Sequence, residues 1–246
     1  MMARDIALIT GSSKGLGLVI AKMLASKNVK VILTGRSQFD LNQALSAFPN
    51  NEHTAFIVDF CQDTECDQLL DFLVEKKLIP TTLVHNLGGR VEGDIFPLDS
   101  EALRRSLKFN LEIAVKINEK FLPYMLKRGQ GKIIHIGSDA SLTGRASPAY
   151  VIAKAALNGY IKTMSQFYAK NSILICGVLP GIMEHENSVW AQKKINQPEY
   201  YQKKLEQMPL GRFGTVEEIA IFVSELAKNG SMMCTGGLFE LCGAAR

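Results

Sequence analysis

A short apolar run that leads into a glycine-rich loop and a helix is the feature that most restricts how this chain can fold. Ile6 to Ile9 is apolar at every position, which is typical of a strand buried on both faces. Residues 10–17 then read Thr-Gly-Ser-Ser-Lys-Gly-Leu-Gly, and apolar positions at helical spacing predict a helix over residues 15–27. This order predicts the first strand and helix of a parallel α/β sheet.

The glycines of this loop also suit it to a nucleotide. Gly11, Gly15 and Gly17 have no Cβ, so the backbone can turn sharply and approach a ligand closely. The helix that follows offers free N–H groups and a positive dipole end, which favour a pyrophosphate. The spacing differs from the commoner Gly-x-Gly-x-x-Gly pattern, and a glycine-rich loop can also be a structural turn. Its place between the first strand and the first helix favours the nucleotide.

Strand-like and helix-like segments alternate along the rest of the chain, which predicts a doubly wound parallel sheet with helices on both faces. A length of 246 residues fits one α/β domain over residues 1–246. Strands are expected near residues 5–10, 29–34, 54–58, 82–86, 132–137, 172–178 and 238–241. Helices are expected near residues 15–27, 40–47, 63–76, 100–128, 148–170 and 215–227, the last begun by a Thr215–Glu218 capping box.

Composition argues against several other classes of protein. A net charge of +4, with basic residues scattered along the chain, gives no basic stripe for nucleic acid. Five cysteines without a Cys-x-x-Cys pair and four dispersed histidines predict neither a metal site nor a disulfide framework. No apolar stretch approaches the roughly 18 residues that span a membrane, and the first residues lead directly into a strand. We therefore expect a cytoplasmic protein.

A tyrosine and a lysine four residues apart supply the chemical signal. Tyr150 and Lys154 fall on one face of the helix predicted over residues 148–170, and Ser138 lies twelve positions before Tyr150. A free tyrosine has a pKa of about 10, and a neighbouring cation would lower it toward the range of general acid–base chemistry. Alone, the pair is also what an ordinary exposed helix face carries.

Taken together, these motifs resemble the short-chain dehydrogenase/reductase family over essentially the whole chain. Residues 10–17 are similar to its cofactor loop, and Asn86-Leu-Gly88 to its Asn-Asn-Ala-Gly segment, with His85 and Leu87 as substitutions. Residues 208–214, Met-Pro-Leu-Gly-Arg-Phe-Gly, are similar to a segment of 3-oxoacyl-carrier-protein reductases. The resemblance implies a Rossmann fold of about seven strands, a ketone or alcohol as substrate, and a nicotinamide cofactor.

The resemblance also implies a role for particular residues. Tyr150 would be the general acid or base, and Lys154 would lower its pKa and hold the cofactor ribose. Ser138 would hydrogen-bond the substrate oxygen, and Asn110 would support Lys154 through a water. Asp59 would contact the adenine. The implied cofactor-binding residues are Gly11, Ser13, Lys14, Gly15, Leu16, Gly17, Arg36, Asp59, Asn86, Gly88, Tyr150, Lys154, Pro180, Gly181 and Ile182.

The end of the second expected strand indicates which cofactor is used. An acidic residue there would bind a ribose 2′-OH, but this chain has Gly35 followed by Arg36. A guanidinium suits a 2′-phosphate, and Lys14 would add a second cation. Arg36 at an exposed strand end is the plainer alternative. We predict NADP.

Residues 182–207 interrupt the regular alternation and carry Trp190, the only tryptophan. A long polar segment beside the cofactor turn is more often a binding segment than idle chain, so we predict a substrate-binding lid, with a surface helical excursion as the alternative. His185 stands near where many relatives have a threonine, and we expect a packing or amide role for it. Small residues on the helix expected over 148–170 and the resemblance predict a homotetramer, or else a dimer.

The sequence thus predicts an NADP-dependent oxidoreductase that reduces a ketone, or runs the reverse reaction. One alternative is a 3-oxoacyl thioester reductase. Another is a nucleotide-binding scaffold without turnover, although such a module would not need Ser138, Tyr150 and Lys154 together.

Overall fold

The expected strands form one parallel sheet. A computed structural model describes residues 5–50, 52–62, 64–185 and 188–245, and over these residues seven strands pair in the order β3-β2-β1-β4-β5-β6-β7. Every neighbouring pair is parallel. The predicted doubly wound α/β fold is therefore confirmed. The strands are β1 (Ile6–Ile9), β2 (Lys30–Gly35), β3 (Thr54–Ile57), β4 (Thr82–His85), β5 (Gly131–Ile136), β6 (Ile173–Pro180) and β7 (Leu238–Leu241).

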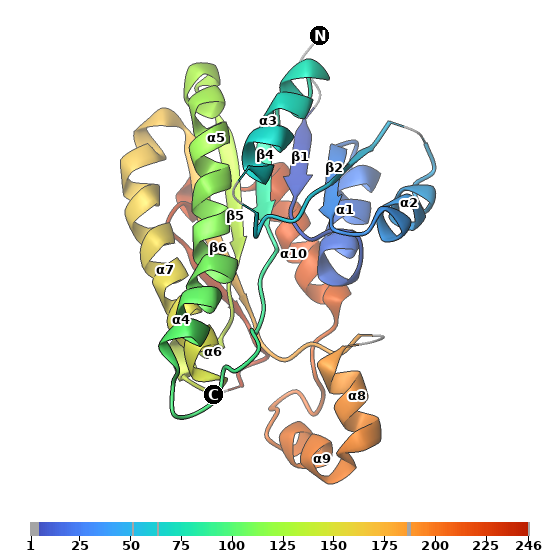
Figure 1. Cartoon of the computed structure of the whole chain (residues 1–246), viewed down its shortest axis with the longest axis vertical. Coiled ribbons are helices and arrows are strands. Elements are labelled where there is room, and N and C mark those ends of the chain that lie inside the picture. Colours follow the sequence, from blue (N-terminus) through green and yellow to red (C-terminus); the bar gives the residue numbers. More distant parts are fainter. Residues whose placement is uncertain (1–4, 51, 63, 186–187, 246) are drawn as a thin grey trace.

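Helices cover both faces of the sheet, as Figure 1 shows. One apolar cluster joins the sheet to α1 (Gly15–Ser26), α2 (Gln38–Ser46) and α10 (Val216–Asn229). A second cluster, on the other face, joins it to α3 (Glu65–Glu75), α5 (Ile113–Arg128) and α7 (Pro148–Tyr168). Burial on both faces explains why the central strands are continuously apolar. The capping box of Thr215 and Glu218 at the start of α10 is present as expected.

The helix expected over residues 100–128 is not one regular α-helix. It consists of α4 (Ser100–Leu107), a π-helical turn (Lys108–Glu112) and α5. Asn110 lies in the wide turn, and its amide nitrogen donates to the carbonyl of Ser106, one turn earlier, at 3.0 Å. A side chain that bonds the helix backbone competes with the regular ladder, and π turns of this kind often mark functional sites.

The described residues of the segment 182–207 include two helices, in keeping with the helical excursion that the sequence allowed as the alternative to a lid. These are α8 (Val189–Asn196) and α9 (Pro198–Glu206); residues 186–187 lie outside the described part of the chain. Figure 1 shows the two helices standing apart from the sheet, beyond the ends of its strands. Tyr201, Met208 and Phe213 form a small apolar cluster of their own beneath them. A further short helix, α6 (Ala140–Thr143), precedes α7, and 3-10 turns lie at Ala169–Asn171 and Met232–Cys234.

Two histidines lie buried side by side in the sheet. His85 on β4 pairs in register with His135 on β5, and their rings stack with centroids 4.6 Å apart. Asn118 accepts a hydrogen bond from His85 Nε2 at 2.7 Å and donates to the Tyr160 hydroxyl at 3.0 Å. Within the described residues, neither ring nitrogen of His135 has a hydrogen-bond partner. Burial therefore lowers the pKa of His85 to about 4 and the pKa of His135 well below its ordinary value.

This pair makes stability depend on pH. As the pH falls below about 6.5, histidines of the unfolded chain take up protons, whereas the buried His85 stays neutral until about pH 4. Stability should fall through this window, by about 2 kcal/mol at pH 5 relative to pH 7.5 from His85 alone. Urea unfolding of the wild type and of His85→Asn at both pH values measures it. An equal loss in the two proteins would show that His85 does not cause the effect.

Candidate active site

The predicted site residues gather at one edge of the sheet. Parallel strands end at the same edge, and the predicted residues lie at or after the carboxyl ends of β1 to β6 or on the helices beside them. From β1 the chain adds β2 and β3 on one side and then β4 to β7 on the other, so the order of strands reverses between β1 and β4. Doubly wound sheets bind ligands at such a point.

The glycine loop after β1 has the geometry of an anion cradle. Gly11 and Gly15 have φ of +61° and +57°, in the left-handed region that favours glycine. A Cβ at Gly17 would lie 2.5 Å from the carbonyl oxygen of Gly11, so only glycine fits there. Lys14, the residue before α1, is extended and its side chain does not cap the helix. The first N–H groups of α1 are thus available to a phosphate, which fits a dinucleotide.

Asn86 fastens the loop after β4 to this cradle. Its side-chain amide donates to the carbonyl oxygens of Thr10 and Gly11 at 3.1 and 2.9 Å. The Thr10 hydroxyl in turn accepts the backbone N–H groups of Asn86 and Leu87, both at 3.0 Å. Asn86, predicted as a cofactor contact, thus has a clear structural task in shaping the glycine loop.

Arg36 and Asp59 follow the ends of β2 and β3. Arg36 is exposed, and Gly35 before it is so close to the glycine loop that a Cβ there would lie 3.0 Å from Ser13 Oγ. Asp59 accepts the backbone N–H of Cys61 at 3.2 Å, and the charge of Arg36 reaches the Cys61 thiol. One cation and one carboxylate therefore follow the neighbouring strands β2 and β3, at the same edge of the sheet as the glycine loop.

Lys154 is held rigidly beneath the site. Its side chain is 3% exposed, and its ammonium donates to the carbonyl of Ile136 at 2.8 Å. Burial lowers the pKa of Lys154 to about 8. A Cβ at Gly88 would lie 3.0 Å from Lys154 Nζ and 2.8 Å from Asn110 Oδ1, so both groups pack against this glycine.

Asn110 locks the same loop from the helical side. Its amide oxygen accepts the N–H of Gly89 and its amide nitrogen donates to the Gly89 carbonyl, both at 2.9 Å. The sequence predicts that Asn110 supports Lys154 through a water. In the structure, Asn110 hydrogen-bonds the backbone of Gly89, which follows the glycine against which Lys154 packs.

Tyr150 does not have the lowered pKa that the sequence predicts. Burial raises the pKa of its phenol, while the hydrogen bond with Ser138 and the charge of Arg90 lower it less. The ammonium of Lys154 lies 5.8 Å from the centre of the Tyr150 ring and is directed at the carbonyl of Ile136. Lys154 is thus not among the groups that lower the pKa of Tyr150, and the loss of water around the phenol raises it.

Ser138 and Asp139 complete the reaction centre after β5. The Ser138 hydroxyl lowers the pKa of Tyr150 and donates to a carboxylate oxygen of Asp139 at 3.4 Å. Burial raises the pKa of Asp139, whose charge in turn disfavours the phenolate of Tyr150. Sequence reasoning missed Asp139, although it directly follows the predicted catalytic serine.

Asp94 is a second residue that the sequence did not reveal. It is 7% exposed, and its carboxylate accepts the backbone N–H groups of Ala149 and Tyr150 at 2.7 and 3.0 Å. Asp94 thus caps the helix that carries Tyr150 and Lys154 from 55 residues away. No local sequence pattern predicts such a cap, because capping residues normally directly precede the helix that they cap.

The turn after β6 closes the site. The Gly181 N–H donates to the carbonyl of Leu241 at 3.0 Å, and the Ile182 carbonyl accepts the N–H of Gly214 at 2.9 Å. A Cβ at Gly15 would lie 3.7 Å from His185 Cε1, which places this histidine over the glycine loop.

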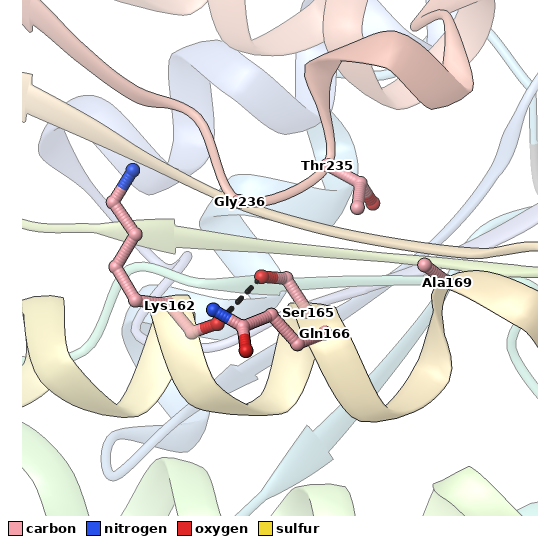
Figure 2. Close-up of a pocket in the computed structure, with 6 residues that line it drawn as sticks. All are labelled: Lys162, Ser165, Gln166, Ala169, Thr235 and Gly236. Carbon is pink, nitrogen blue, oxygen red and sulfur yellow. Dashed lines mark hydrogen bonds between the residues drawn. The ribbon is translucent and has the colours of Figure 1, made fainter.

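A cavity of about 310 Å³ lies elsewhere, between α7 and the segment of Thr235 and Gly236 that precedes β7 (Figure 2). It is lined by Lys162, Ser165, Gln166, Ala169, Thr235 and Gly236, and the Ser165 hydroxyl donates to the Lys162 carbonyl within it. None of the predicted catalytic residues faces it, so it does not compete with the site at the strand ends. Over the described part of the chain, no group of three metal-ligating side chains is present and no helix is long and apolar enough to cross a membrane.

Comparison with known proteins identifies the family of this chain. The model of the short chain dehydrogenases matches residues 5–196. The chain belongs to the short-chain dehydrogenase family. A 3-oxoacyl-[acyl-carrier-protein] reductase of Vibrio cholerae is 29% identical over 97% of this chain and 96% of its own length. A 2,3-dihydroxy-2,3-dihydro-p-cumate dehydrogenase of Pseudomonas putida is 28% identical over 98% of this chain and 94% of its own.

A solved structure agrees. The 3-oxoacyl (acyl-carrier-protein) reductase of Agrobacterium tumefaciens, with NADP bound, superposes with a TM-score of 0.88 at 25% identity, over 97% of this chain and 93% of that one. This short-chain dehydrogenase therefore shares the fold of a reductase that binds a dinucleotide, and it is an oxidoreductase by family.

The Asp94 cap yields a prediction with a built-in control. Asp99 caps α4 in the same way, accepting the N–H groups of Glu101 and Ala102, both at 3.2 Å. Replacing either aspartate by alanine should cost about 0.5–2 kcal/mol of stability. Only Asp94→Ala should also lower turnover, by roughly ten- to a hundredfold, because it loosens the start of α7 beneath Tyr150. Urea unfolding and kcat measured on both variants make the comparison; equal kcat values would rule out a positioning role for Asp94.

Proposed function

We propose that this short-chain dehydrogenase reduces a ketone to a secondary alcohol with NADPH, or catalyses the reverse reaction, with Tyr150 as the general acid or base. The observation that carries the proposal is that the ammonium of the buried Lys154 lies 5.8 Å from the centre of the Tyr150 ring, while Ser138 is close enough to act on the pKa of the same phenol. A nucleotide-binding scaffold would gain nothing from burying a phenol, a hydroxyl and an ammonium together. NADP, when bound, supplies or accepts the hydride.

The protein's own groups would divide the remaining work. Tyr150, whose pKa is raised by burial, is protonated at neutral pH and is suited to donate its proton to a carbonyl oxygen. Ser138 would hold the same oxygen. Lys154 and Asn110 would keep the loop of Gly88 and Gly89 in place beneath the substrate and the cofactor ribose.

Three features favour NADP and its expected position. The uncapped start of α1 suits the pyrophosphate, and exposed Arg36 suits a 2′-phosphate. The NADP-bound Agrobacterium tumefaciens reductase has the same fold. We further propose a single oxidoreductase domain over residues 1–246, with 182–207 as a substrate-binding lid, acting as a homotetramer.

A 3-oxoacyl thioester reductase is the second candidate. It is favoured by the Vibrio cholerae relative, whose 29% identity extends over nearly the whole chain. The Pseudomonas putida relative, a dihydrodiol dehydrogenase by name, is as similar and points to a different substrate. A panel of ketones, alcohols and an acetoacetyl thioester, read by NADPH absorbance, separates the two.

Replacement of Tyr150 by phenylalanine tests the chemistry. The ring is kept and only the proton carrier is lost, so cofactor affinity should persist while kcat falls by at least roughly 10²–10⁴-fold. Tyr168→Phe, on the same helix but away from the site, is the matched control and should keep wild-type turnover. A wild-type kcat for Tyr150→Phe on a verified substrate would remove Tyr150 from the mechanism.

Cofactor titration tests the role of Arg36. A hydrogen bond to a charged group contributes about 1.5–3 kcal/mol, so the wild type should bind NADPH roughly ten- to a hundredfold more tightly than NADH. Arg36→Met should remove most of this preference, and Lys127→Met, which deletes an exposed charge at the other edge of the sheet, should not. Position 35 is unsuited to substitution because a side chain there would press on Ser13. Equal affinities in the wild type would refute the NADP assignment.

A further inference from the structure

The loop between Gly88 and α4 is held at three points by hydrogen bonds, to the π turn, to α4 and to the start of α7. Gly89 exchanges two hydrogen bonds with Asn110, and Asp94 accepts the N–H groups of Ala149 and Tyr150. Between them, Arg105 donates to the carbonyl of Glu92 at 3.0 Å. The residues between Gly89 and Asp94 therefore have little freedom to move away from the reaction centre.

Arg90 is the cation on this short stretch. It is exposed, and over the described residues its guanidinium makes neither an ion pair nor a hydrogen bond. Its position between the two fixed points brings its charge close to the phenol of Tyr150, whose pKa it lowers. An arginine that has no protein partner has five N–H donors available to a ligand.

The other charged group facing Tyr150 has the opposite sign and lies after a different strand. Asp139 follows β5 and hydrogen-bonds Ser138, whereas Arg90 follows β4. Asp94, the carboxylate nearest along the loop, is occupied by the two amides at the start of α7. The reaction centre is thus positive on the β4 side and negative on the β5 side. A substrate that carries an anion would be drawn to one side and repelled from the other.

We propose that Arg90 is a specificity-determining residue that binds an anionic group, a carboxylate or a phosphate, on the ketone or alcohol substrate. This inference rests on the proposed oxidoreductase function and names the substrate class of that same site. The fork of the guanidinium matches the two oxygens of either anion. Repulsion by Asp139 would orient the anion toward residues 89–94 and leave the carbonyl carbon between Ser138 and Tyr150.

Matched pairs of anionic and neutral ketones test the proposal. The pairs are acetoacetate with methyl acetoacetate, 4-oxopentanoate with its methyl ester, and dihydroxyacetone phosphate with dihydroxyacetone. The first two pairs probe a carboxylate and the third a phosphate. NADPH oxidation gives kcat/KM for the wild type, Arg90→Met, Arg90→Lys and the remote control Lys127→Met.

In at least one pair the wild type should prefer the anion, and Arg90→Met should reduce that preference roughly ten- to a hundredfold through KM. Turnover of the neutral partner should change less than turnover of the anion, because the loss of the Arg90 charge acts on Tyr150 equally with both substrates. Arg90→Lys should retain part of the preference, because it keeps the charge and loses the fork. Raised salt should weaken the wild-type preference, since Arg90 is exposed. Lys127→Met should match the wild type.

Two results would overturn the proposal without contradicting the proposed oxidoreductase function. One is turnover of the neutral partner at least as efficient as that of the anion in every pair. The other is an anion preference that survives Arg90→Met. If none of the ketones supported NADPH oxidation, both the proposal and the proposed function would be overturned. This outcome differs from the two above, so the two failures can be told apart.

Discussion

The buried ammonium of Lys154 is the constraint around which the site is arranged. An isolated charge in the interior is costly, and this one is offset by a hydrogen bond to the carbonyl of Ile136 at the end of β5. The cost is visible in a pKa lowered to about 8, which still leaves the group mostly protonated at neutral pH. The position of the ammonium then fixes its surroundings: Gly88 must lack a side chain, and Asn110 must hold the loop of Gly88 and Gly89 in place.

The same burial decides the chemistry of Tyr150. Removing water from the phenol favours its neutral form, and neither Ser138 nor Arg90 reverses the effect. In the proposed mechanism a protonated Tyr150 is the form that donates a proton to a carbonyl oxygen during reduction. In the proposed oxidation the same group must first lose its proton.

The sequence predicted those parts of the structure that depend on local patterns. The strands appear within a few residues of their expected positions because continuous apolar runs demand burial on both faces, and the Thr215–Glu218 capping box is set by residues three apart. The turn chemistry of Gly11 and Gly15 follows equally from residue type. What the sequence missed depends on contacts between distant segments. The π turn at Asn110, the cap from Asp94 to α7 and the raised pKa of Tyr150 all arise from packing that no window of residues contains.

The missed contacts share a physical origin. Asp94, Asp139 and Arg90 lie in the loops after β4 and β5, neighbouring strands whose carboxyl ends both open onto Tyr150. The ends of β4 and β5 determine where those loops start. The sequence of each loop determines which charged groups lie around the phenol of Tyr150. In the proposed mechanism Tyr150 supplies the proton, and Arg90 and Asp139 act on its pKa in opposite directions. Substrate selection by this chain would then depend most directly on residues 89–94 and on Asp139, which lie in loops beyond the ends of the strands.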